Sequence, residues 1–197
     1  MEQKQSGAFI KILDHIIRDF RFRPIRKNLP KTMSSVLDIG CGPIPWFMSF
    51  DPKQFSKVQF TVLDKDNYIF EDENYAVTSI GSMLEKTLPF PDASFDCVTI
   101  FAVLEHLVYP EEISKEIKRV LKPGGSLLLT VPSPLAKPIL EFLAFMLHVI
   151  DEESIRDHKR YLSAKKISEL LLRAGFLDVN SYYFEFGCNV FARAISK

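Results

Sequence analysis

Residues 36–42, Val-Leu-Asp-Ile-Gly-Cys-Gly, carry an apolar run into an aspartate and then at once into a turn with two glycines. Such a run is typical of a parallel strand that is buried on both faces. Gly40 and Gly42 accept backbone angles that other residues avoid, and they have no side chain that would block an approaching molecule. We therefore expect a buried strand whose carboxyl end passes close beneath a bound ligand.

A second carboxylate, Asp64, ends the next apolar run, residues 58–63. In nucleotide-binding α/β folds, an acidic residue at the end of the second strand accepts hydrogen bonds from the hydroxyls of a ribose. The two features together predict an adenosine-type ligand. Asp64 could instead cap a following helix, because aspartate favours that position.

The glycine turn fits a pyrophosphate poorly. A dinucleotide fingerprint has a third glycine where this chain has Pro45. Pro43 and Pro45 also remove two amide donors from the turn. Asp38 sits badly beside a pyrophosphate, but it suits a ligand with an ammonium or sulfonium group. These residues favour S-adenosylmethionine (SAM), whose methionine end carries both positive groups, and a nicotinamide oxidoreductase is the weaker alternative.

Five stretches, in matching order and spacing, resemble the class I SAM-dependent methyltransferases, in particular the small type 11 (UbiE/UbiG-like) group. They are residues 36–42, Thr61-Val62-Leu63-Asp64, Leu88 to Asp96, Val103-Leu104-Glu105-His106-Leu107 and Arg119 to Gly125. The resemblance covers residues 34–131 closely and 158–195 more loosely. It implies a single α/β domain over residues 1–197, with a Rossmann-like, doubly wound, mostly parallel seven-stranded sheet whose final strand is antiparallel.

The resemblance also implies a function, the transfer of a methyl group from SAM to a small-molecule or lipid-like acceptor by direct displacement. This reaction depends largely on holding the acceptor and the methyl group in line, so it requires no nucleophile on the protein. The alternative is a protein of the same fold that binds SAM, another adenosyl ligand or a partner protein without catalysis.

The cofactor contacts of the family carry over to the carboxyl ends of the strands. The resemblance implies that Asp38 lies near the methionine end of SAM, Asp64 at the ribose and Phe101 beside the sulfonium. Ser82 stands where the family has an acidic residue that contacts the adenine amine, and Met83 could pack on the adenine ring. The expected cofactor residues are Asp38, Gly40, Cys41, Gly42, Asp64, Lys65, Ser82, Met83 and Phe101.

Two positions depart from the family pattern. Ile44 replaces a third glycine that lets the following helix pack close to the turn, and Ser82 replaces the acidic residue. The loss of the glycine is expected to shift the cofactor, to shorten that helix or to mark a domain that has lost activity.

The acceptor is expected to meet the methyl group beside Glu105 and His106. His106 could act as a general base, because imidazole titrates near neutral pH, or it could only position the substrate. We expect no metal ion, because the histidines show no ligand spacing and no cysteine lies beside one. The histidines are His15, His106, His148 and His158.

Residues 132–161 are an insertion above the methyl-donor edge, where the family places acceptor-binding elements. They are expected to include an apolar helix at 139–150, and a helix that is apolar on nearly all faces is usually buried. Our hypothesis is a lid over an acceptor with an apolar portion, with His158 and Arg160 at the polar end. The same helix could instead rest on a membrane surface or on a second subunit.

The chain as a whole alternates strands with helices, as expected of a parallel sheet that is covered on both faces. An amphipathic helix is predicted at 7–20, ending before Pro24, and a basic segment then leads to the first strand. Further helices are predicted at 46–50, 66–73, 111–121 and 163–173. Strands are predicted at 35–39, 58–63, 75–80, 97–101, 126–131, 177–184 and 188–195.

The composition indicates an ordinary soluble enzyme of the cytoplasm. The 25 basic residues balance the 25 acidic ones, so no net field attracts nucleic acid. Three cysteines without a CxxC pair indicate a reducing compartment, and the first residues lack the apolar core of a signal peptide. No uncharged apolar run approaches the roughly 20 residues of a membrane span. Peripheral contact with a membrane and the oligomeric state stay open.

Overall fold

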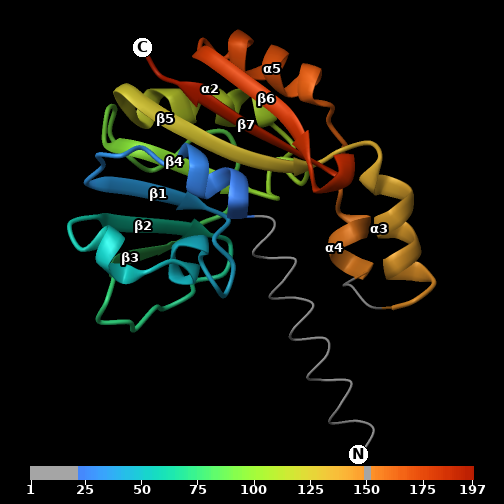
Figure 1. Ribbon diagram of the computed structural model, residues 1–197, viewed down its shortest axis with the longest axis horizontal. Coiled ribbons are helices and arrows are strands. Elements are labelled where there is room, and N and C mark those ends of the chain that lie inside the picture. Colours follow the sequence, from blue (N-terminus) through green and yellow to red (C-terminus); the bar gives the residue numbers. More distant parts are fainter. Residues whose placement is uncertain (1–21, 149–151) are drawn as a thin grey trace, which may run out of the picture.

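The computed structural model describes residues 22–148 and 152–197, and one mixed sheet forms its centre (Figure 1). The helix predicted over residues 7–20 lies outside the described residues. Seven strands follow the order β3-β2-β1-β4-β5-β7-β6. They are β1 (Ser35–Ile39), β2 (Gln59–Asp64), β3 (Ala76–Gly81), β4 (Phe95–Phe101), β5 (Leu121–Pro132), β6 (Leu177–Phe184) and β7 (Asn189–Ile195).

The direction of the strands confirms the predicted fold class. Strands β1 to β5 pair in parallel, and β7 pairs antiparallel with both β5 and β6. The chain continues from β1 toward β2 and β3 on one side and from β4 toward β5 on the other. The strand order therefore reverses between β1 and β4. Ligands of open α/β sheets bind outside the carboxyl ends of the strands at such a reversal.

Each face of the sheet carries its own apolar cluster. Leu37 and Ile39 of β1 belong to the cluster beneath the helices α2 (Pro110–Val120) and α5 (Ala164–Arg173). Val36 belongs to the cluster on the opposite face, which is rich in aromatic side chains and includes Trp46 and Phe60. This alternation has the period of two residues that a strand imposes, and it leaves β1 buried on both faces as predicted.

The segment that follows the glycine turn is short. Only a four-residue 3-10 helix, η1 (Trp46–Ser49), forms there, and a second one, η2 (Pro52–Phe55), comes after it. This agrees with one of the outcomes expected from Ile44, a shortened helix. Pro43 and Pro45 contribute to it, because proline lacks the amide that a helical turn needs.

Among the described residues, one predicted helix is absent, and a helix around Pro24 was not predicted. Residues 66–73 form no helix, because Asp64 Oδ1 accepts a hydrogen bond from the amide of Asp66 at 3.1 Å and Asp72 Oδ1 accepts one from the amide of Asn74 at 2.9 Å. Such local bonds compete with helical ones. Residues 22–28, within the predicted basic segment, form a helix that includes Pro24. Burial of the neighbouring Phe22 and Ile25 in the aromatic cluster stabilises this helix.

The inserted helix differs from its predicted range. α3 spans Ala136–Phe145, and a separate short helix, α4 (Glu152–Arg156), comes after it. Both lie beyond the carboxyl ends of the parallel strands (Figure 1). Another 3-10 helix, η3 (Glu185–Gly187), joins β6 to β7. Within residues 22–148 and 152–197, no helix combines the length and the apolar character that a bilayer span requires.

Candidate active site

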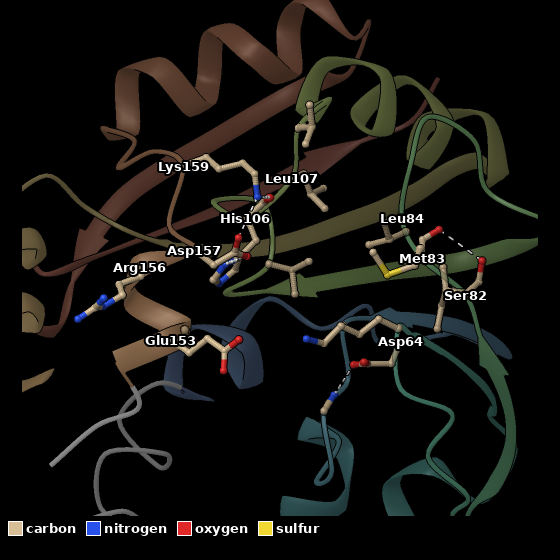
Figure 2. Close-up of a pocket in the computed structure, with 17 residues that line it drawn as sticks. Asp64, Ser82, Met83, Leu84, His106, Leu107, Glu153, Arg156, Asp157 and Lys159 are labelled. Carbon is tan, nitrogen blue, oxygen red and sulfur yellow. Dashed lines mark hydrogen bonds and ion pairs between the residues drawn. The ribbon is translucent and has the colours of Figure 1, made fainter. Parts of the chain in front are cut away.

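A pocket of about 960 Å³ lies at the carboxyl ends of β1 to β4 (Figure 2). Asp64, Ser82 and Met83 stand on one side of it, while His106, Asp157 and Lys159 stand on the other. Residues of α4 complete the wall. The pocket is therefore at the place that the reversal of strand order predicts, and its two sides differ in chemistry.

The two glycines of the turn have different reasons to be glycine. Both have positive φ angles, 70° at Gly40 and 60° at Gly42. A Cβ atom on Gly40 would stand 2.1 Å from Val103 Cγ2, whereas a Cβ atom on Gly42 would meet nothing within 4 Å. Position 40 thus requires a glycine, because any side chain there would collide with the segment that follows β4. At position 42 the absence of a side chain leaves open space in the pocket wall. The Gly42 amide donates to Asp64 Oδ2 at 2.9 Å.

A chain of hydrogen bonds holds Asp38 on β1. Thr99 Oγ1 donates to Asp38 Oδ1 at 2.7 Å, and Trp46 Nε1 donates to Thr99 Oγ1 at 3.0 Å. Because the indole can only donate, it leaves the single hydroxyl hydrogen of Thr99 for the carboxylate. Asp38 Oδ2 is buried and has no hydrogen-bond partner among the described residues. Burial raises the pKa of Asp38 to about 7, so a cationic ligand group would stabilise its charged form.

The side of the pocket beside β2 and β3 has the features of a nucleoside site. Asp64, Lys65, Ser82 and Met83 line it. Asp64 does not cap a helix, since none follows it. Its carboxylate braces the glycine turn and keeps lone pairs for further donors. Met83 is 70% exposed and offers an apolar surface to a flat ring.

The opposite side contains an acid–imidazole pair that links distant parts of the chain. His106 Nδ1 and Asp157 Oδ2 are 3.0 Å apart. Lys159 Nζ donates to the His106 carbonyl at 2.6 Å and to Asp157 Oδ1 at 3.1 Å. Burial alone would raise the pKa of Asp157, but the hydrogen bonds from Lys159 and His106 outweigh it and lower that pKa below its ordinary value. The carboxylate is therefore ionised at neutral pH.

Next to this pair, His158 packs against His106 with ring centroids 4.7 Å apart. His158 Nδ1 lies 3.0 Å from the Tyr161 hydroxyl. Burial, and then the neighbouring His106, lower the pKa of His158 below its usual value. Glu105 is almost fully buried, with 1% of its surface exposed.

The predicted site residues fall into two groups. Those that line the pocket are Gly40, Gly42, Asp64, Lys65, Ser82, Met83 and His106. Those that are not part of its lining are Asp38, Cys41, Phe101, Glu105, His158 and Arg160. Phe101 packs its ring against Trp46, and burial beside Asp38 and Asp64 raises the pKa of Cys41, which stays a thiol.

Sequence reasoning missed part of the site. The polar end of the insertion was assigned to His158 and Arg160, but the pocket wall is formed by Asp157 and Lys159. Residues 158–160 have no regular secondary structure, so no periodic pattern indicated which of these side chains would face the pocket. Thr99 and Trp46 carried no recognisable signal, because their role depends on packing behind the turn.

Comparison with known proteins supplies the family. Residues 13–181 match the family model of the methyltransferase domain. The chain belongs to this family. The methyltransferase is 28% identical, over 194 residues, to the demethylmenaquinone methyltransferase of Staphylococcus epidermidis, covering 85% of this chain and 80% of that protein. It is also 28% identical, over 185 residues, to the ubiquinone/menaquinone biosynthesis C-methyltransferase UbiE of Nitrosospira multiformis, covering 82% of this chain and 74% of the relative.

A solved structure of similar fold comes from Aquifex aeolicus. The SAM-dependent methyltransferase from this organism superposes with a TM-score of 0.64 at 20% identity, covering 96% of this chain and 98% of that one. The chain is thus a class I SAM-dependent methyltransferase of the UbiE-like type, and the nicotinamide alternative is set aside. The residues present fit SAM, because the unpartnered Asp38 oxygen and the nucleoside side of the pocket match its cationic and adenosine ends.

Proposed function

We propose that this methyltransferase acts on a hydroxylated aromatic ring that carries an apolar tail, the reduced (quinol) form of a quinone of the kind named in its relatives. The observation that carries the proposal is the two-sided pocket, with nucleoside-binding features on one side and the His106–Asp157 pair on the other. Cofactor and acceptor would face each other within one cavity. We further propose that it works in the cytoplasm, in keeping with its unpaired cysteines.

In the proposed complex, SAM lies along the carboxyl ends of β1, β2 and β3. Asp64 accepts from the ribose hydroxyls, Ser82 and Met83 contact the adenine, and Asp38 Oδ2 accepts from the ammonium of the methionine end. The free oxygen of Asp38 supports this orientation, since a buried carboxylate oxygen without a donor is costly. Gly42 leaves room for the cofactor, and Lys65 lies beside the ribose.

On the acceptor side, His106 is proposed to receive a proton from the acceptor hydroxyl through Nε2, since Nδ1 faces Asp157. The electron pair released into the ring would then be available at a ring carbon to take the methyl group, which SAM would supply with S-adenosylhomocysteine as the leaving group. The methylated carbon would lose its own proton to solvent, and His106 would return the first proton to the ring oxygen, so that the hydroxyl is restored. Asp157 would hold the imidazole in the required orientation and stabilise its protonated form.

The insertion 132–161 is proposed to be the lid of a single domain. Its α4 residues line the pocket, and Arg156 joins α4 to α3 by lying 5.3 Å above the Phe145 ring. The face of α3 is not core, because Ile139, Phe142 and Met146 are 45%, 53% and 69% exposed. An apolar tail, or the membrane surface that contains it, would cover this face.

The test is methyl transfer to a defined quinol. The protein is incubated with SAM labelled in its methyl group and with a reduced, short-tailed demethylmenaquinone, and the label is followed into the organic extract. Label in the quinol is expected. The oxidised quinone serves as the control, because it has no hydroxyl proton to lose. Binding of SAM without transfer to the quinol would contradict the proposed acceptor and favour a non-catalytic SAM-binding protein.

A further inference from the structure

We propose that Glu105, His106 and His158 form a binding site for a divalent transition-metal ion on the acceptor side of the pocket. One ligand atom from each residue lies within 4.8 Å of the others. Zinc binds histidine nitrogen and carboxylate oxygen at about 2.0–2.2 Å. Side-chain movements that shift each ligand atom by about 1 Å would therefore let all three atoms bind one ion at metal–ligand distances of about 2.0–2.2 Å.

The orientation of both imidazoles supports this site. His106 uses Nδ1 toward Asp157, and His158 uses Nδ1 toward the Tyr161 hydroxyl, each at 3.0 Å. The Nε2 atom of each ring is thus the one that remains to bind an ion. Histidines that bind metals almost always engage their other nitrogen with a carboxylate, a carbonyl or water, which fixes the ring and raises its basicity. Asp157 has this relation to His106, and Lys159 in turn fixes Asp157.

The chemistry of the ligands selects the class of ion. Two imidazoles and one carboxylate suit Zn²⁺, Co²⁺, Fe²⁺ or Mn²⁺ better than Mg²⁺ or Ca²⁺, which prefer oxygen alone. Glu105 supplies the carboxylate oxygen of the cluster, and its side chain is almost fully buried beside the two imidazoles. With three protein ligands, such an ion keeps an open coordination position, as catalytic metal sites do.

An oxygen of the acceptor would occupy that open position. An ion there would lower the pKa of a bound hydroxyl. In the metal-bound protein, this ion would promote loss of the hydroxyl proton in place of His106, whose Nε2 would then be a ligand and not the base proposed above. The acceptor part of this inference rests on the proposed function, whereas the binding of the ion does not. The expectation of no metal ion rested on spacing along the chain, in which residues 105 and 106 are far from residue 158.

The experiment is a titration of the full-length, chelator-treated protein with Co²⁺, read by its visible absorption. One ion per chain is expected for the wild type. His158→Ala and Glu105→Gln should each weaken binding at least tenfold. The matched control is His148→Ala, because His148 is exposed and paired with Glu152 away from the cluster. A melting shift with SAM verifies that each variant is folded.

The outcomes separate this inference from the proposed function. If Co²⁺ binds the wild type no more tightly than His158→Ala, the metal site is refuted, while SAM binding and methyl transfer remain to support the function. If Co²⁺ binds as expected but no quinol is methylated, the metal site is supported and the proposed acceptor is contradicted. If His148→Ala loses the ion as fully as His158→Ala, binding is not at this cluster and the inference is wrong.

Discussion

At Asp38, two neutral side chains in series, Thr99 and Trp46, hold a buried carboxylate by one oxygen and leave the other without a donor. Neutral donors compensate a buried charge less than a cation does. The ammonium of SAM is the group that would complete the compensation. Protonation, cofactor binding and stability should therefore be linked through this residue.

We expect the free energy of unfolding without SAM to fall as the pH rises from about 4 to about 7. The pKa of Asp38 rises from 3.8 to about 7 on folding, so the folded chain holds a proton that the unfolded chain has lost, and stability decreases through this window. The slope from this group is at most about 1.4 kcal/mol per pH unit. Denaturant unfolding at several pH values measures it. Asp38→Asn, which stays neutral, should show a flatter profile, and equal profiles would contradict the linkage.

Asp64→Ala should weaken SAM binding at least tenfold. The variant loses hydrogen bonds to ribose, each contributing about 1.5–3 kcal/mol when one partner is charged, and it also loses the brace on the Gly42 amide. Titration calorimetry measures the affinity. Asp66→Ala is the control, because Asp66 is a neighbouring exposed carboxylate whose side chain meets only the Tyr68 hydroxyl among the described residues. Unchanged affinity in Asp64→Ala would mean that the ribose is held elsewhere.

The secondary elements differ in how far their sequences determine them. Runs such as 35–39 and 177–184 form strands at the predicted positions. There the pattern of apolar residues in the sequence is consistent with the burial that a strand at that place in the sheet requires. The 66–73 segment did not form a helix, since aspartates at both ends bond their own backbone. The apolar sequence of α3 predicted a helix, but not that its face would be exposed. Exposure depends on where β5 directs the chain beyond the edge of the sheet.

Deletion of residues 136–150 should abolish methyl transfer while SAM binding persists. The cofactor residues belong to the sheet, whereas α3 belongs to the insertion that is proposed to cover the acceptor. Turnover of the quinol and a melting shift with SAM measure the two effects. Loss of the folded state on deletion would contradict the lid.

Phe142→Ser is the finer variant for the same element. It should reduce turnover of long-tailed acceptors and change stability by less than about 0.5 kcal/mol, as is usual for a surface substitution. Leu172→Ser on α5 is the matched control, because Leu172 is similarly exposed, at 56%, and belongs to α5, outside the insertion 132–161. An equal effect of both substitutions would show that α3 has no special role.

The whole molecule brings together residues that the sequence keeps far apart. Gly40 and Asp64 could be predicted as site residues, since both stand at strand ends within recognisable motifs. Asp157 and Lys159 could not, because their position depends on how the insertion folds back over the segment after β4. The mostly parallel sheet with an antiparallel final strand was predictable from the alternation of elements together with the resemblance. The pairing of the two sides of the pocket required the tertiary structure.

SAM and S-adenosylhomocysteine should each raise the melting temperature, and NAD should not. A ligand that binds only the native state adds about 2.7 kcal/mol at a hundredfold excess over its dissociation constant. Differential scanning fluorimetry on protein stripped of bound ligand measures the shift. A shift with NAD alone would contradict the cofactor site described above.

The contact between Gly40 and Val103 has a further consequence. A Cβ atom on Gly40 would collide with Val103, and the carbonyl of Val103 accepts a hydrogen bond from the His106 amide at 2.9 Å. The glycine turn, proposed to contact SAM, and the segment 103–106, proposed to contact the acceptor, are therefore in direct contact, so that a shift of one would move the other. Coupling between two binding sites is reciprocal, so SAM and the acceptor should alter each other's affinity by the same factor.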